Sequence, residues 1–331
     1  MKNKKLVLTA LILLSAFPLC AGNLQFSFEP EFGGIYGTIF ENVWYADSVF
    51  TQSTITTTPT ARESQLDWQL QNVFYTGAAV NLTFSEHYSF DFDFKTAFPS
   101  LAGIMEDFDW LNPIYWPSDP IDQITNYSIH LMYLDNFTKT RFCFGYTFIL
   151  NQKLNFSITP KIGIEAQSFY FLGKSGYSLY KSNGWAKEYF TAGATVITYS
   201  QAFTAPLAGL SLKLDFAKYF ETDLSFLVTY INKYDAYDDH FERHDSGKTC
   251  YFNDKLQDVF IFDSSIKLFW KINEHNKLGL KGSVNISPKA YGYTYSSKTS
   301  FEELSDQPSM SDLGGSSRLL FTYALVYQFY F

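Results

Sequence analysis

Apolar and polar residues alternate along most of this chain. Between residues 88 and 95, aromatic side chains occupy every second position, and Ser, Asp or Lys side chains lie between them. The same period of two recurs at residues 210–216 and 321–331. Successive side chains of a β-strand point to opposite faces, so the pattern predicts strands with one apolar and one polar face.

The alternating segments are too long for an ordinary soluble sandwich, whose strands typically have about 5 to 6 residues. Residues 63–84 and 207–232 each run past 20 residues. Long strands favour a transmembrane barrel, which must close because an edge strand in lipid has no partner for its amides. Ten strands are predicted, an even number as in bacterial single-chain barrels: 24–45, 62–83, 87–100, 128–150, 153–173, 186–204, 207–232, 248–271, 276–297 and 316–331. We therefore predict an all-β fold, a closed ten-stranded antiparallel transmembrane barrel in a single domain.

Polar breaks of two lengths separate these strands. The short breaks are interpreted as periplasmic turns and lie at 85–87, 151–153, Pro206 and 273–276. The long breaks are interpreted as extracellular loops and lie at 47–62, 99–127, 174–187, 235–248 and 296–315. In such a barrel, with short periplasmic turns and long extracellular loops, any catalytic or binding residues in the long loops are expected to face the outside of the cell.

The N-terminus has the pattern of a secretory signal peptide. An apolar run at 6–19 follows three lysines and precedes Cys20, Ala21 and Gly22, so we predict a signal peptide at 1–22 and a barrel domain at 23–331. A lipoprotein anchored through Cys20 is the alternative, which Leu19 disfavours because a small residue is expected directly before such a cysteine. The protein is therefore expected to leave the cytoplasm.

Composition and net charge limit the classes of binding partner that the protein is expected to have. The 34 phenylalanines, 24 tyrosines and 6 tryptophans make up 19% of the chain, and an aromatic content this high is typical of a barrel whose outer face contacts lipid. Removing 1–22 takes away three lysines and no acids, which moves the formal charge from −8 to −11. An acidic chain suits cationic ligands, so we expect no nucleic-acid partner. Cys143 and Cys250 are too few for a disulfide scaffold.

Two predicted outer loops contain residues suited to acid–base chemistry. The period of two places Asp107 and Asp109 on one side of the first loop, and Asp238 with His240 on one side of the other. A carboxylate beside an imidazole raises the pKa of the ring and fixes its tautomer, as a water-activating base requires. Glu242 and His244 add metal-ligand types, but an HxxxH step faces one way only on a helix, so no metal site is expected.

Four groups of residues carry a resemblance to a known family. They are Glu63, Ser64, Gln65, Leu66, Asp67 and Trp68; residues 105–110; Tyr199, Gln201, Phe203, Pro206 and Gly209 around an inner turn; and 238–240 with Asp245, Gly247 and Lys248. In this order, on a barrel of this strand count, the chain resembles the omptin outer-membrane proteases over most of its mature length.

The resemblance implies site residues. Asp107 and Asp109 match the family's aspartate pair, and Asp238 and His240 match its Asp/His pair. Glu41 matches the acidic residue that receives a basic substrate side chain. The family's loop motif of Thr, Ser and His corresponds to Thr125, Ser128 and His130, with Ile124 in place of its Trp, if about eight extra residues are accepted upstream.

Two departures from the family leave alternatives open. Ala236 stands where many members have a second substrate-binding aspartate, although Asp235 is adjacent. Three residues are inserted between His240 and Asp245, which permits an alignment that places Glu242 and His244 in the catalytic roles. Lys174 is a candidate for the family's lipopolysaccharide-binding basic residues.

The resemblance implies an outer-membrane endopeptidase with an outward-facing groove, no cofactor, and lipopolysaccharide as a candidate activator. Cationic peptides or proteins are the expected substrates, outer-membrane lipid is the expected surround, and a monomer is expected. The alternative is a barrel that binds without catalysis, an adhesin that has lost activity. A porin is disfavoured because open pores typically appear at about 16 strands.

Overall fold

The structure is a computed structural model that describes residues 24–50, 55–304 and 312–331, so the predicted signal peptide lies outside the described residues. The strands are β1 (Leu24–Phe50), β2 (Ile55–Phe84), β3 (Tyr88–Ala97), β4 (Ser100–Asp109), β5 (Asn126–Tyr146), β6 (Phe148–Asn151), β7 (Phe156–Tyr180), β8 (Lys187–Tyr189), β9 (Thr195–Ala217), β10 (Phe220–His240), β11 (Tyr251–Lys271), β12 (Asn276–Ser297) and β13 (Asp312–Tyr330). Short helical segments are α2 (Asn112–Tyr115), η1 (Lys181–Asn183) and η2 (Phe241–Ser246). Within the described ranges, no helix combines the length and apolar character of a membrane span.

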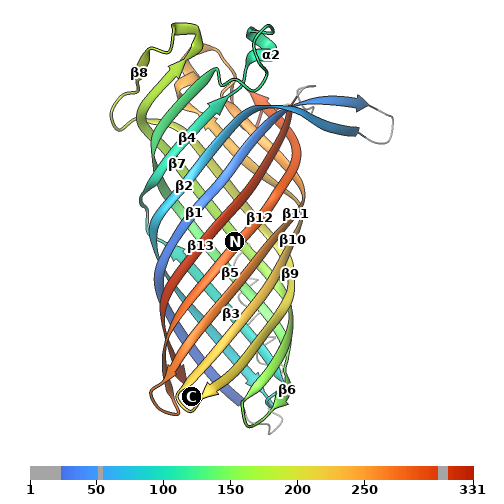
Figure 1. Cartoon of the computed structure of the whole chain (residues 1–331), viewed down its shortest axis with the longest axis vertical. Coiled ribbons are helices and arrows are strands. Elements are labelled where there is room, and N and C mark those ends of the chain that lie inside the picture. The colour runs from blue at the N-terminus through green and yellow to red at the C-terminus, as the bar shows by residue number, and fades with distance from the viewer. Residues whose placement is uncertain (1–23, 51–54, 305–311) are drawn as a thin grey trace.

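The strands form one closed antiparallel wall. Each wall strand pairs with the next along the chain, and β13 returns to pair with β1 from Ser27↔Tyr330 to Tyr45↔Asp312. Strands β3 and β4 share one place, because both pair with β2 on one side and β5 on the other. With β6 and β8 as short additions, ten places complete the circle, which confirms the predicted ten-stranded barrel. Figure 1 shows the tilted strands, with α2 and β8 at one end and the C-terminus at the other.

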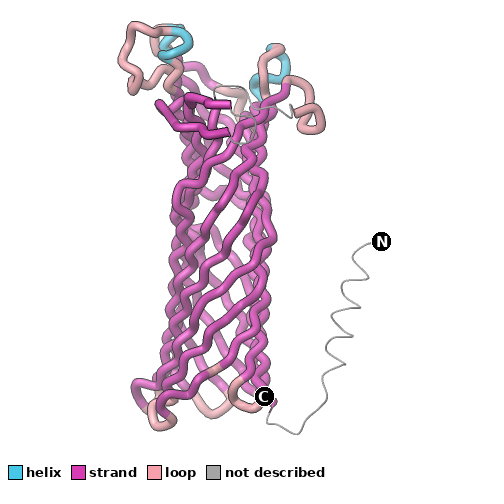
Figure 2. Tube along the Cα trace, turned by 90° about the vertical axis from the view of Figure 1, so that its right-hand side faces the viewer, coloured by secondary structure: helices cyan, strands magenta, loops and turns pink. Residues whose placement is uncertain are grey.

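The alternation of the sequence separates an apolar outer face from a more polar lumen. The outer face exposes large rings and aliphatic chains, such as Phe32, Tyr36, Phe142, Phe226 and Phe321. A belt of this kind, surrounding a closed barrel, is the surface that lipid covers. Short turns lie at the end that carries the C-terminus, and the larger loops lie at the opposite end (Figure 2).

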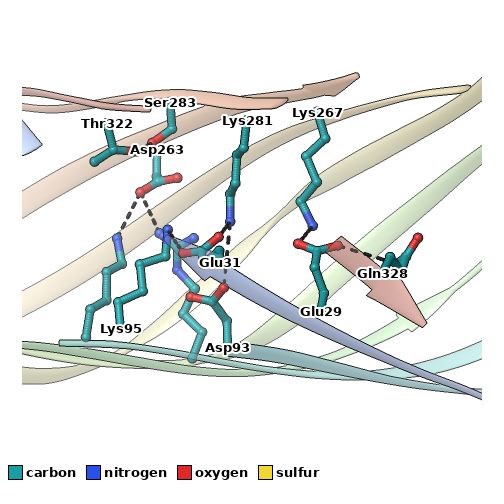
Figure 3. Close-up of polar contacts among 12 residues, drawn as sticks. Glu29, Glu31, Asp93, Lys95, Asp263, Lys267, Lys281, Ser283, Thr322 and Gln328 are labelled. Carbon is teal, nitrogen blue, oxygen red and sulfur yellow. Dashed lines mark hydrogen bonds and ion pairs between the residues drawn. The ribbon is translucent and has the colours of Figure 1, made fainter. Parts of the chain in front are cut away.

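The lumen is filled along its length by rings and by ion pairs. Trp68 stacks on Phe171 and on Tyr199, with 5.6 Å between ring centroids in each pair. Farther toward the short turns, charged side chains pair across the barrel (Figure 3). Lys281 Nζ lies 2.6 Å from Glu31 Oε2. Asp263 receives Lys139 at 2.9 Å and Arg141 at 2.6 Å. These contacts join β5 to β11 through the lumen and stiffen the wall that holds the loop end.

The predicted turn at Pro206 is wrong, and the strand boundaries around it shift. Residues 195–217 form β9, and the turn to β10 lies at residues 218–219. Proline cannot donate to a sheet ladder. Pro206 pairs with Ile164 of β7, whereas on its other side the pairing of β9 with β10 is interrupted between Thr229 and Ala236. The interruption explains how a proline fits inside a long strand.

Two predicted outer loops are also shorter than expected. The stretch 99–127 contains β4 and α2, and the first part of 235–248 belongs to β10. The predicted strand 186–204 corresponds to β8, an irregular segment and the first half of β9. The predicted strand 207–232 crosses from β9 into β10. The acidic candidates therefore lie on strand ends, a more rigid support than a free loop.

Candidate active site

One cross-strand row brings several candidate residues onto the same inner face. Glu41 of β1 pairs with Leu66 of β2, Leu66 pairs with Asp107 of β4, and Asp107 pairs with Ser128 of β5. Directly opposite residues of an antiparallel pair share a face. Because Leu66 and Ser128 are buried, the row faces the lumen. Asp109, two residues after Asp107, lies on that face as well.

The Asp/His pair stands on a different part of the wall. Asp238 and His240 are the last alternating residues of β10, and Asp238 pairs with the buried Tyr199 of β9. Asp238 Oδ2 lies 2.7 Å from His240 Nε2, and both side chains are buried. The ring of Phe252 packs edge-on against the imidazole at 5.3 Å. The spacing of two thus gives a direct hydrogen bond on a strand, not in a loop.

The two acidic pairs share one electrostatic environment across the lumen. Burial raises the pKa of Asp107 well above its usual range, and the neighbouring Asp109 raises it further. His240 and Arg243 act on Asp107 in the opposite direction. Burial also raises the pKa of Asp109, against the effects of the same two cations. Two carboxyl groups of raised pKa that face an imidazole are suited to holding a shared proton.

The imidazole of His240 is stabilised as a cation. Burial and Arg243 both lower its pKa, but the charge and hydrogen bond of Asp238, together with Glu242, outweigh them and raise the pKa to about 10. Glu242 Oε1 lies 3.1 Å from His240 Nδ1, so each ring nitrogen has a carboxylate partner. The sequence indicated Glu242 only as a metal-ligand type and as an alternative catalytic residue, and not as a partner of His240, because this contact depends on how η2 turns after β10.

The alternative pairing of Glu242 with His244 does not form. His244 Nε2 instead lies 2.6 Å from Asp239 Oδ1. Asp239 alternates with Asp238 along β10 and therefore lies on the opposite face of the strand. The aspartates of the two Asp–His pairs thus lie on opposite faces of β10, with His244 reaching back from η2, and the pair of Asp238 and His240 faces the lumen.

Glu41 lies beside the Asp/His pair as a buried acid. Burial raises its pKa well above the usual range, and the charges of Asp238, Asp254 and Asp107 add to the effect. Its Oε2 atom is buried and has no hydrogen-bond partner among the described residues. Asp254 of β11 was not a candidate from sequence, and its pKa rises to about 7, mainly through burial. A buried carboxyl with one unpartnered oxygen, surrounded by other acids, is a place that a cation would fill.

Ser128 and His130 lie on β5 and not in a loop, contrary to the loop motif that the resemblance suggested. His130 Nδ1 donates to the Ser175 carbonyl at 2.6 Å, and His130 Nε2 lies 2.8 Å from Ser128 Oγ. Burial lowers the pKa of His130. Both ring nitrogens of this histidine are therefore held in place, and burial disfavours its charged form. Thr125 accepts a hydrogen bond from the Leu111 amide and ties the loop after β4 to β5.

No group of three or more His, Cys, Asp and Glu side chains in the described ranges has the arrangement of a metal site. The barrel with this site at its loop end defines a class, the outer-membrane barrels that have polar residues gathered at the loop end.

Comparison with known proteins identifies the family within that class. The pattern of the omptin family matches residues 54–329. Protease 7 of Escherichia coli O157:H7 and of Escherichia coli strain K12 are each 24% identical over 293 residues, which cover 85% of this chain and 84% of the relative. The crystal structure of the outer-membrane protease OmpT from Escherichia coli superposes with a TM-score of 0.77 at 18% identity, covering 93% of this chain and 97% of that one.

The chain belongs to the omptin family. Family membership supports a protease of the outer membrane.

Proposed function

We propose that this protein is an outer-membrane endopeptidase that cleaves peptides or proteins near basic residues, with its active site facing outward. The observation that carries the proposal is the hydrogen bond of 2.7 Å between Asp238 and His240, in a buried site that also contains Asp107 and Asp109. The exposed aromatic rings of the outer face would contact outer-membrane lipid and so place the site above the bilayer. On β1, for example, the exposed Tyr36 lies five residues before Glu41.

In the proposed reaction, a water molecule lies between the two acidic pairs. His240 takes a proton from the water as the oxygen attacks the peptide carbonyl, and Asp238 stabilises the imidazolium that forms. Asp107 or Asp109, protonated because of its raised pKa, donates a hydrogen bond to the carbonyl oxygen. The imidazolium then returns its proton to the leaving amine. No covalent intermediate and no cofactor is required.

The preference for basic residues is assigned to Glu41. A lysine or arginine side chain that reaches Glu41 would ionise it and form a charge-assisted hydrogen bond. Asp254, which lies close enough to interact with Asp238, adds negative charge to the same region. Ala236 offers no carboxylate at the position where many omptins have one. Ser128 and His130 are proposed to shape the opposite side of the groove.

Lipopolysaccharide is proposed as an activator of a monomeric enzyme. Lys174 lies over the ring of Tyr133 at 4.9 Å and is the proposed cation for a lipid phosphate. Cleavage measured in lipopolysaccharide-containing and lipopolysaccharide-free micelles tests this role. A Lys174→Gln variant that needs no more lipid than the unmodified protein would contradict it.

The decisive test of function is digestion of a peptide with paired basic residues by the purified, refolded barrel. Mass spectrometry is expected to find cleavage beside a basic residue, and none with His240→Ala. Binding of the peptide without cleavage, both with and without lipopolysaccharide, would instead support an adhesin. The rings that stack below the site, Trp68 with Phe171 and Tyr199, disfavour an open pore.

A further inference from the structure

His240 has no free ring nitrogen in this structure. Nε2 is held by Asp238 at 2.7 Å and Nδ1 by Glu242 at 3.1 Å. An ionised carboxylate only accepts hydrogen bonds, so the ring donates from both nitrogens and is an imidazolium. An imidazolium cannot remove a proton from water. One of the two carboxylates must therefore release the ring before the proposed reaction can begin.

The two partners differ in how easily they can leave. Asp238 is 5% exposed and stands on a strand that is paired on both sides. Glu242 is 23% exposed, belongs to the short η2 segment, and makes the longer contact. Arg243, beside it, offers Glu242 an alternative partner at 3.3 Å. The geometry makes Glu242 the partner that can move.

We propose that Glu242 is a positioning residue that holds His240 in a resting, protonated form, and that catalysis requires Glu242 to withdraw from Nδ1. The inference rests on the proposed function. When Glu242 withdraws, the Nδ1 proton passes to solvent, the Nε2 proton stays toward Asp238, and the Nδ1 lone pair is free to accept the proton of the attacking water. Glu242 lies in the stretch between His240 and Asp245 that contains the three inserted residues. The proposed regulation of His240 by Glu242 is therefore a feature of this chain's own sequence.

The charged groups around His240 set the direction of the expected pH effect. They are Asp238 on β10, Glu242 and Arg243 on η2, and Asp107 and Asp109 on β4, with Glu41 on β1 and Asp254 on β11 interacting with Asp238. His130 on β5 is titratable too, and burial favours its neutral form. Strand β11 also presents the uncharged ring of Phe252. Arg243 opposes the imidazolium, whereas the carboxylates favour it. Removing the negative charge of Glu242 takes away a group that raises the pKa of His240 and leaves the opposing charge of Arg243 in place, so the ring should lose its proton at lower pH.

The first experiment compares the pH profiles of kcat/KM for the unmodified protein and for Glu242→Gln. Glutamine can still accept a hydrogen bond from Nδ1 but has no charge. The acidic limb of the profile is expected to move down by roughly one to three pH units, the usual effect of an adjacent opposite charge. Asp245→Asn is the matched control, since it removes an exposed carboxylate from the same η2 segment and should leave the limb in place. An unmoved limb in Glu242→Gln, or an equal shift in the control, would overturn the proposal.

The second experiment does not depend on protease activity. Histidine-labelled protein in micelles is titrated by NMR, and His240 is assigned among the five histidines by its loss in His240→Gln. The His240 signal is expected to titrate at lower pH in Glu242→Gln than in the unmodified protein. An unmodified protein whose His240 is already neutral at pH 7 contradicts the resting form. A confirmed shift without any peptide cleavage would retain the role of Glu242 and reject the protease instead.

Discussion

Replacing Asp238 by Asn tests the charge of the Asp/His pair with little change of shape. Asp238 Oδ2 lies 2.7 Å from His240 Nε2, and the aspartate side chain is 5% exposed. With an effective dielectric constant of about 20, two unit charges at that distance attract by about 6 kcal/mol, which is an upper bound. Since each 1.36 kcal/mol of transition-state stabilisation is about tenfold in rate, the expected loss of kcat/KM reaches roughly 10⁴-fold.

The assay is initial-rate cleavage of a peptide with paired basic residues, measured at each variant's own pH optimum. Asp239→Asn is the matched control, because Asp239 is the next residue and makes the same type of contact, to His244, on the other face of β10. The control is expected to retain activity within about twofold, as expected for a substitution away from the reacting groups. A loss below about tenfold in Asp238→Asn, or equal losses in both variants, would refute the reasoning.

Three further predictions follow from the same geometry. Glu41→Gln should reduce the preference for a basic over a neutral side chain at the cleavage site by roughly 10- to 100-fold, measured as a ratio of kcat/KM values; an unchanged ratio would rule out Glu41 as the binding group. Asp263→Asn removes one of the two carboxylates that Lys139 and Arg141 share, so that Glu165 alone faces two buried cations, and the free energy of unfolding in lipid vesicles should fall by roughly 3–5 kcal/mol. A urea titration followed by Trp fluorescence measures this, and a change below about 1 kcal/mol would contradict it. The raised pKa of His240, about 10, stabilises the folded state fully below the ordinary histidine value of 6.5, and this contribution is lost as pH rises through about 10. The stability difference between the unmodified protein and His240→Gln should therefore shrink over that range, and a constant difference would count against a charged ring.

The barrel could be predicted from sequence because lipid and lumen impose a strict period of two on each strand. The period is clear where the outer face meets lipid, as at Phe90, Phe92 and Phe94. The alternation of apolar and polar residues is lost beyond the lipid-facing surface, toward the loop end, where both faces of a strand are polar. On β4 the outward Glu106 bonds Gln69, while Asp107 faces inward, so the segment resembles a loop in the sequence. The sequence pattern therefore predicts loops where the structure has β4 and the end of β10.

The site could be predicted only in part, for a similar reason. The two acidic pairs are each separated by one residue, so alternation alone places their members together. The contacts of Glu242 and Asp254 depend on how η2 turns back and on the register of β11, which no local pattern encodes. Pro206 gives the opposite error, in which part of a strand is predicted as a turn. Whether a proline interrupts a sheet depends on whether a strand is paired on the side where its amide would donate, and β9 is not paired with β10 at Pro206.

The central claim is that Asp107 and His240, from opposite parts of the wall, act on one water molecule. The most direct measurement is a double-mutant cycle on kcat/KM with Asp107→Asn, His240→Gln and the combined variant. Residues that act as a unit give strongly non-additive losses. We expect the combined variant to be about as slow as the slower single variant. A loss equal to the product of the two single losses would mean that the two side chains work independently.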